Sequence, residues 1–208
     1  SYTAEAKIKI LKTEGTEYAN VQIPYYNDQR NAQNKEYVSQ IEATAYNMEN
    51  GQVVKTKMKK EYIFRERIND KFMQIKFSIP SVKVGTVIEY KYKLASDFYY
   101  QLKGWEIQEE IPVVSSNYDI TIPEYFRFNF EMRGEPVINT NRKDVSVSFP
   151  IAGKSIRCNA TQIVFQANDI PPLKADNYIW CPDDYKSQII FELSALDFPG
   201  SGFRSFTT

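Results

Sequence analysis

The chain has 208 residues, 42 % of them hydrophobic, so it is long enough to bury a core and does not resemble a disordered protein. Its 26 Lys and Arg balance 26 Asp and Glu, which gives no support for nucleic acid or an anionic membrane as a partner. His is absent, which excludes Ser-His-Asp and Cys-His catalysis and His-ligated zinc within this chain. No run of about 18 apolar residues occurs, so we expect no membrane-spanning helix.

The first third of the chain reads as paired β-strands. Residues 5–11 and 18–23 alternate in polarity, and we expect them to form a hairpin with Glu14-Gly15 near its tip. Residues 38–46 and 53–60 flank Asn50-Gly51, a pair suited to the two positive φ angles of a type I′ turn. We expect 38–46 to alternate without interruption. Residues 62–68 and 72–79 follow as strands on either side of Asn69-Asp70, and 27–35 form a polar loop.

The clearest strand lies within residues 82–94, VKVGTVIEYKYKL. Ile88, Tyr90, Tyr92 and Leu94 alternate with charged residues, which predicts one face on a core and one in water. Gly85 precedes the strand, where a turn would use its freedom at positive φ. We therefore expect a central strand of a β-sheet.

Similar patterns continue through the second half of the chain. Further strands are predicted over residues 105–111, 113–122, 125–132, 144–149, 155–158, 161–166 and 189–196. No stretch has sustained helical periodicity. A strand about every ten residues predicts an all-β fold with little helix, which we interpret as a large antiparallel β-sandwich of about twelve to fourteen strands.

The composition changes after Asn168, where Pro171-Pro172 interrupts the pattern. We expect a β-sandwich domain over 1–168, and over 169–208 an irregular tail whose last strand completes that domain. Residues 198–208 read as a connector to a further domain. The chain as a whole reads as a piece of a longer protein.

Four aromatic residues do not fit an alternating core: Tyr99, Tyr100, Trp105 and Trp180. Exposed aromatic rings on loops stack on sugars or anchor peptides, so these four are the candidate ligand-binding residues. The alternative is that they fill the ends of the sandwich or contact a neighbouring domain.

Other polar groups suggest no catalysis. Glu109 and Glu110 are adjacent, and adjacent strand residues face opposite sides, so they do not form an acid-base pair. Asp176, Asn177, Asp183 and Asp184 could donate oxygen ligands to Ca²⁺, but they lack the spacing of a calcium loop. We therefore expect no catalytic residue, no metal site and no cofactor in this chain.

Two further features each have two readings. Lys55, Lys57, Lys59 and Lys60 form a basic run, typical of an edge strand protected from aggregation, with contact to a polyanion as the alternative. Cys158 and Cys181 are either two structural thiols or a disulfide, and neither has a His to make it a nucleophile.

Several motifs together resemble a bacterial domain of unknown function that precedes a transglutaminase-like core in extracytoplasmic proteins. They lie, in order, at residues 8–26, 41–64, 79–94, 105–113, 122–128 and 187–193. The resemblance implies a large antiparallel β-sandwich and a periplasmic, secreted or cell-surface location. It also implies a downstream domain with the catalytic Cys, His and Asp, and it carries over no site residue to this chain.

From these observations we expect a non-catalytic accessory domain that recognises a substrate or positions a catalytic core, with the parent protein a transglutaminase-like protein or cysteine peptidase. Its partner would be that downstream domain, together with a protein or glycan ligand. A carbohydrate-binding module and a structural protein-interaction domain are the alternatives.

Overall fold

The computed structural model describes residues 1–30, 34–98, 100–134, 137–151, 154–173, 186–200 and 202–206. These residues form fourteen strands, all paired antiparallel, and two short 3-10 helices. The predicted all-β fold with little helix is therefore confirmed. The strands are distributed over two compact units, residues 1–99 and 100–208, each with two sheets of its own.

The first unit contains seven strands among its described residues. They are β1 (Tyr2–Lys9), β2 (Asn20–Tyr26), β3 (Glu36–Glu49), β4 (Gln52–Lys57), β5 (Ile63–Arg67), β6 (Phe72–Ser78) and β7 (Val87–Ser96). The 3-10 helices are η1 (Glu14–Ala19) and η2 (Lys60–Tyr62). One sheet has the order β1-β7-β3-β4 and the other the order β2-β6-β5.

Both sheets of this unit contribute to one core. β2 and β6 supply Ile23 and Ile75, while β3 and β7 supply Ala45 and Ile88, and all four side chains are buried in the same cluster. A polar pair lies among them: the Thr86 hydroxyl donates a 2.6 Å hydrogen bond to Asn47 Oδ1. Every buried side-chain polar atom of the described residues has a partner, so this pair joins the core without an unsatisfied group.

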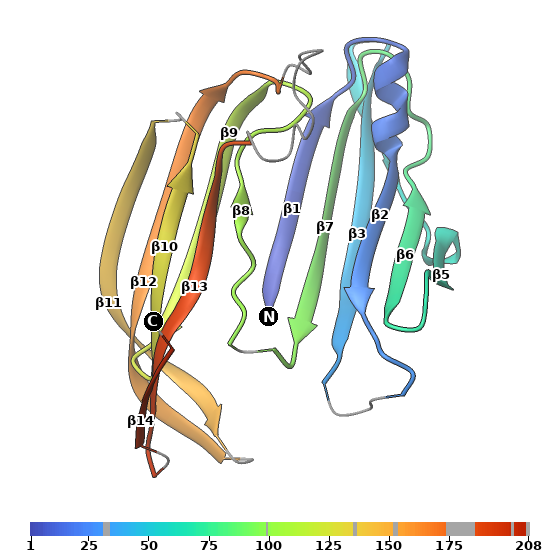
Figure 1. Ribbon diagram of the computed structural model, residues 1–208. Coiled ribbons are helices and arrows are strands. Elements are labelled where there is room, and N and C mark those ends of the chain that lie inside the picture. Colours follow the sequence, from blue (N-terminus) through green and yellow to red (C-terminus); the bar gives the residue numbers. More distant parts are fainter. Residues whose placement is uncertain are drawn as a thin grey trace, which may run out of the picture. The chain divides into compact units, whose positions relative to one another are not determined.

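The strand predicted at the centre of a sheet is β7, which lies between β1 and β3 (Figure 1). Ile88 and Leu94 are buried, and Tyr90 and Tyr92 pack against the core. Gly85 has φ +91°, as the turn before the strand requires. The alternating sequence predicted this strand correctly because one face of β7 is buried and the other is exposed to solvent.

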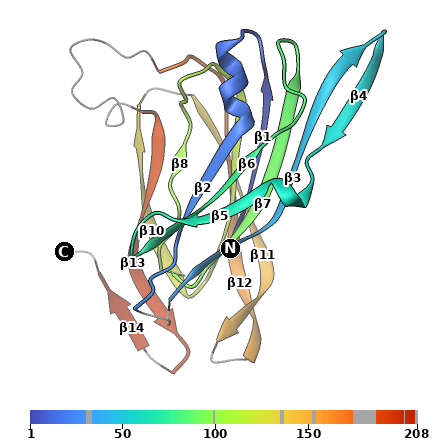
Figure 2. The same ribbon diagram turned by 90° about the vertical axis from the view of Figure 1, so that its right-hand side faces the viewer.

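Two predicted hairpins have opposite outcomes. The β3–β4 hairpin is confirmed, with Asn50 at φ +48° and Gly51 at φ +78°, and Figure 2 shows it reaching away from β7. The hairpin between 5–11 and 18–23 is wrong, because β1 pairs with β7 and β2 with β6. The intervening residues form η1, which carries the chain from one sheet to the other.

Uninterrupted alternation over 38–46 is also wrong, because β3 contains a β-bulge. Ser39 pairs with Lys93 and Glu42 with Lys91, so two residues of β3, Gln40 and Ile41, oppose a single residue of β7. Before the bulge the buried residue is Val38, at an even-numbered position. Beyond the bulge the extra residue shifts the buried positions to odd numbers, Ala43 and Ala45.

The second unit also has seven strands among its described residues. They are β8 (Trp105–Glu106), β9 (Val113–Pro123), β10 (Phe126–Arg133), β11 (Ile138–Ile151), β12 (Lys154–Ile170), β13 (Gln188–Phe198) and β14 (Gly202–Ser205). One sheet has the order β11-β12-β9, and the other has the order β10-β13-β14 with β8 also paired to β13.

The core of this unit is rich in aromatic rings. Phe165 on β12 is fully buried and contacts Trp105, Phe130 and Phe191. Trp105 also stacks on Tyr118, with ring centroids 6.1 Å apart. Aromatic contacts therefore join strands of both sheets.

Several strand boundaries of this half differ from expectation, and the strand predicted over 144–149 extends over Ile138–Ile151 as β11. The segments 155–158 and 161–166 belong to a single strand, β12, because each continues the pairing with β11. The strand predicted over 105–111 is limited to Trp105–Glu106. The predicted connector 198–208 contains β14, which pairs with β13. β12 continues to Ile170. The domain boundary proposed after Asn168 stays a prediction.

Candidate functional site

A groove lies on the outer face of the β2-β6-β5 sheet. Gln22 pairs with Lys76, and Lys76 pairs with Phe64, so these three side chains share one face of the sheet. The neighbouring residues Phe77 and Ile23 point to the other face and are buried in the core. Alternate residues of these strands point into the core, which leaves the Phe64 side chain on the solvent-exposed face. Phe64 is 61 % exposed.

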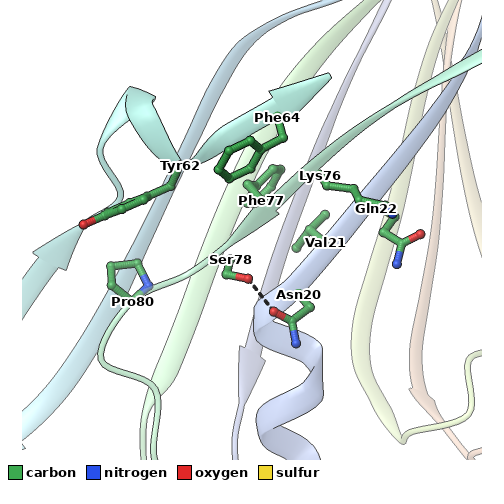
Figure 3. Close-up of a pocket in the computed structure, with 9 residues that line it drawn as sticks. All are labelled: Asn20, Val21, Gln22, Tyr62, Phe64, Lys76, Phe77, Ser78 and Pro80. Carbon is green, nitrogen blue, oxygen red and sulfur yellow. Dashed lines mark hydrogen bonds between the residues drawn. The ribbon is translucent and has the colours of Figure 1, made fainter. Parts of the chain in front are cut away.

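The groove has a volume of about 370 Å³, and its lining is drawn in Figure 3. Tyr62 and Pro80 lie at one end, Gln22 lies at the other, and the Phe64 ring lies between them. Tyr62 is 41 % exposed. The remaining lining residues are Asn20, Val21, Lys76, Phe77 and Ser78. The surface therefore combines two accessible aromatic rings with amide and hydroxyl groups.

The charge of the groove is neutralised within the sheet. Lys76 forms an ion pair with Glu66, and Gln74 donates a hydrogen bond to the same carboxylate. The bond from Lys76, followed by that from Gln74, holds the pKa of Glu66 below its ordinary value, so the carboxylate stays ionised. Because Lys76 has this partner, the groove favours ligands that are apolar or uncharged and polar.

The aromatic rings lie at an edge of the sheet. Phe64 is on β5, the last strand in the order β2-β6-β5, and Tyr62 ends η2 immediately before that strand. Ile63 packs against the core and anchors the strand between Tyr62 and Phe64. An edge strand offers backbone groups on one side for pairing with another chain. The arrangement can therefore bind an extended segment by its backbone and its side chains together.

Two of the four aromatic residues predicted to bind a ligand, Tyr100 and Trp105, are among the described residues. Trp105 is 6 % exposed and lies in the core of the second unit, where its Nε1 donates a 3.0 Å hydrogen bond to Ser116 Oγ. Trp105 therefore packs in a core rather than on an exposed loop. Tyr100 is 38 % exposed. Tyr99 and Trp180 lie outside the described residues.

The carboxylate and metal predictions concern parts of the second unit. Burial, followed by the neighbouring Glu106 carboxylate, raises the pKa of Glu109. The candidate calcium ligands at positions 176, 177, 183 and 184 lie outside the described residues. Among the residues that are described, no group of three His, Cys, Asp or Glu side chains is placed to hold a metal ion.

Cys158 is buried, and burial followed by the Glu124 carboxylate raises the pKa of its thiol. The thiol is therefore protonated at neutral pH and is a poor nucleophile. Its possible disulfide partner, Cys181, lies outside the described residues, so that pairing stays a prediction.

The basic run lies at an edge, as its composition suggested. Lys55 and Lys57 belong to β4, the last strand of its sheet. The Lys55 ammonium lies 5.5 Å from the centroid of the Tyr46 ring. Edge protection is thus a sufficient explanation of these lysines, and a polyanion contact stays a prediction.

Sequence reasoning missed the groove because Tyr62 and Phe64 were read only as part of a strand. The signal was available in the stretch YIFRERI, where Tyr62 and Phe64 alternate with Ile63 and Arg65. Alternation places the rings together, but it does not say which face is buried. Which face of β5 is buried depends on which face of the neighbouring strand β6 packs against the core.

No membrane-length apolar helix occurs in the part of the chain that the structure describes. Comparison with curated proteins finds no match. A solved structure of a putative protease from Parabacteroides distasonis ATCC 8503 is similar in fold, with a TM-score of 0.62 at 12 % sequence identity. The likeness covers 91 % of this chain and 36 % of that protein, so the chain spans about a third of its solved relative.

A family model described as a domain of unknown function with a solved structure, DUF3857, matches residues 1–174. The match includes the whole first unit, with its groove, and continues into the second unit through β12. It covers well over half of the chain. The chain therefore belongs to the DUF3857 family.

Proposed function

We propose that this chain is a non-catalytic accessory module that binds extended polypeptide substrates for a catalytic domain of the same protein. The observation that carries the proposal is the neutral aromatic groove beside the edge strand β5. Tyr62 and Phe64 supply apolar contact area, while Asn20 and Gln22 supply hydrogen-bonding groups. An extended peptide placed along β5 would use both.

Two further observations support an accessory role. The absence of His rules out a Cys-His catalytic pair made by this chain alone. The similar Parabacteroides protein is described as a putative protease and is much longer than the region that matches this chain. We propose that the catalytic domain is transglutaminase-like, as the motif resemblance implies, and that the protein is periplasmic or exported.

The direct test measures binding of the chain to an array of extended peptides, with binding to the strongest member then followed by fluorescence anisotropy. Phe64→Ala is expected to weaken that binding roughly tenfold or more, because it removes the central ring of the groove. Tyr37→Ala is the matched control, since Tyr37 is a similarly exposed aromatic residue of the first unit that does not line the groove. It should bind as the unmodified chain does.

The same surface favours a second candidate, a carbohydrate-binding module, because aromatic rings beside amide side chains also suit sugars. A glycan array separates the two. Glycan binding that depends on Phe64, with no peptide binding, would replace the peptide proposal. Binding to neither class, or peptidase or crosslinking activity from this chain alone, would overturn the accessory-module proposal.

A further inference from the structure

The outer face of the β2-β6-β5 sheet continues beyond the groove to a second apolar surface. The Ile68 N–H donates a 3.0 Å hydrogen bond to the carbonyl oxygen of Phe72, which places Ile68 opposite Phe72. Phe72 pairs in turn with Tyr26, and the two rings meet edge-on with centroids 5.6 Å apart. Ile68 is 49 % exposed and Phe72 is 40 % exposed, and neither lines the groove. Exposed apolar side chains therefore lie at both ends of β5.

A carboxylate lies between these two apolar surfaces. Phe64, Glu66 and Ile68 are at alternate positions of the chain, so their side chains share the outer face. Lys76 and Gln74 both donate to Oε1 of Glu66, and no described residue donates to Oε2. The Glu66 side chain is 47 % exposed and does not line the groove. Its second oxygen is therefore available to a hydrogen-bond donor of a ligand.

The backbone of β5 is able to pair with a further strand. In an antiparallel pair, residues that bond the partner strand alternate with residues whose backbone groups point away from it. Because the Ile68 N–H bonds β6, the backbone groups of Arg67 and Arg65 point to the other side. Among the described strands, β5 pairs with β6 alone. An antiparallel strand added at this edge would exchange hydrogen bonds with Arg65 and Arg67.

We propose that β5 selects peptide segments in which a hydrogen-bond donor, such as Lys, Arg or Gln, lies two residues from an apolar residue on each side. The selection rests on the proposed function, since it assigns a sequence preference to the same peptide site. In an added antiparallel strand the three specified side chains lie opposite Ile68, Glu66 and Phe64 and share their face. The apolar residues bury contact area, and the donor bonds Oε2 of Glu66. An acidic residue at the central position would face a like charge.

The test measures fluorescence anisotropy of a peptide with the sequence Ser-Leu-Thr-Lys-Thr-Phe-Ser, labelled at its amino end and amidated at its carboxyl end. It should bind the chain. The isomer Ser-Thr-Leu-Lys-Phe-Thr-Ser has the same composition, but its apolar residues no longer share a face with Lys, and it should bind roughly tenfold more weakly. Replacing the central Lys with Glu should weaken binding about fivefold.

Methylation of single peptide nitrogens tests strand addition itself. The two Thr residues lie opposite Arg65 and Arg67, so their N–H groups point to β5, and methylating either nitrogen should weaken binding roughly tenfold. The Lys N–H points away from β5, and methylating it should have little effect. Equal effects of methylation at Thr and at Lys would overturn the pairing with β5.

Variants of the chain identify the side chains that recognise the pattern. Ile68→Ser should weaken binding about fivefold, because it removes the apolar contact beyond Glu66. Val53→Ser is the matched control, since Val53 is a similarly exposed β-branched residue of β4, on the other sheet, and it should not affect binding. Glu66→Gln should remove the preference for Lys over Glu. Circular dichroism checks that each variant is folded.

Two outcomes separate the sequence preference from the proposed function. Peptide binding that depends on Phe64 but is equal for the two isomers would overturn the preference and leave the peptide-binding function standing. No binding of any peptide to the folded, unmodified chain would overturn both.

Discussion

The two units use the same architecture, two packed antiparallel sheets, with different cores. The first unit has a buried Asn47–Thr86 pair, a bulge in β3 with Gln40 at φ +52°, and the groove described above. The second has a core of contacting aromatic rings around Phe165. The difference places the candidate binding surface on the first unit, on the outer face of a sheet whose other face covers the core.

Truncation of each core is expected to produce the largest effects. Phe165→Ala should destabilise the second unit by about 3–5 kcal/mol, because it removes a fully buried ring that contacts three others. Ile75→Ala should destabilise the first unit by about 2–5 kcal/mol. Hydrogen exchange should report each loss in the amides of the mutated unit. Equal loss in both units from either variant would show that they unfold together.

Removing the buried polar pair tests what distinguishes the core of the first unit. Thr86→Val keeps the shape but leaves Asn47 Oδ1 without its donor and the Lys83 backbone N–H without its acceptor. The expected loss is about 1–3 kcal/mol in chemical denaturation. Thr121→Val, at an exposed strand position of the second unit, should change the stability by less than about 0.5 kcal/mol. A neutral Thr86→Val would mean that the pair contributes no net stability.

The turn of the β3–β4 hairpin should have a smaller effect. Gly51→Ala places a side chain at φ +78° in open space, so the loss is conformational strain of about 1 kcal/mol. Gly15→Ala is the matched control, because Gly15 does not have a positive φ and an added Cβ would lie 3.6 Å from Ile10. Thermal unfolding should separate the two variants, and equal midpoints would contradict the assignment of strain to Gly51.

The smallest effect concerns Glu109 in the second unit. Its pKa is raised in the folded state by burial and then by Glu106, so its neutral form favours folding. That contribution is complete below the pKa of the unfolded chain and is lost as the pH rises through the folded pKa. Glu109→Gln should therefore be slightly more stable than the unmodified chain at neutral pH, by less than about 0.5 kcal/mol, and the gain should vanish in acid.

Unfolding midpoints across this pH range measure that difference. Glu192→Gln, at an exposed position of β13, controls for loss of one negative charge from the same unit. A gain from Glu109→Gln that persisted unchanged in acid would show that ionisation of Glu109 is not its cause.

The sequence alone determined those features that depend on local geometry. Alternation identified β7 because Ile88 and Leu94 must leave water together, and Asn50-Gly51 identified a turn because its backbone angles suit those residues. The absence of His excludes imidazole chemistry from this chain whatever its fold.

Tertiary structure decided which strands pair with one another and which face of each strand is buried. β1 and β2 are neighbours in sequence but join different sheets, since each finds its apolar contacts and its backbone partner on a distant strand. Trp105 is core rather than surface because β8 pairs with β13. Phe64 lies in a groove because the opposite face of β6 meets the core, and the bulge at Gln40 moves the buried positions of β3 from Val38 to Ala43 and Ala45. These arrangements depend on contacts between residues far apart in the chain, which local periodicity does not specify.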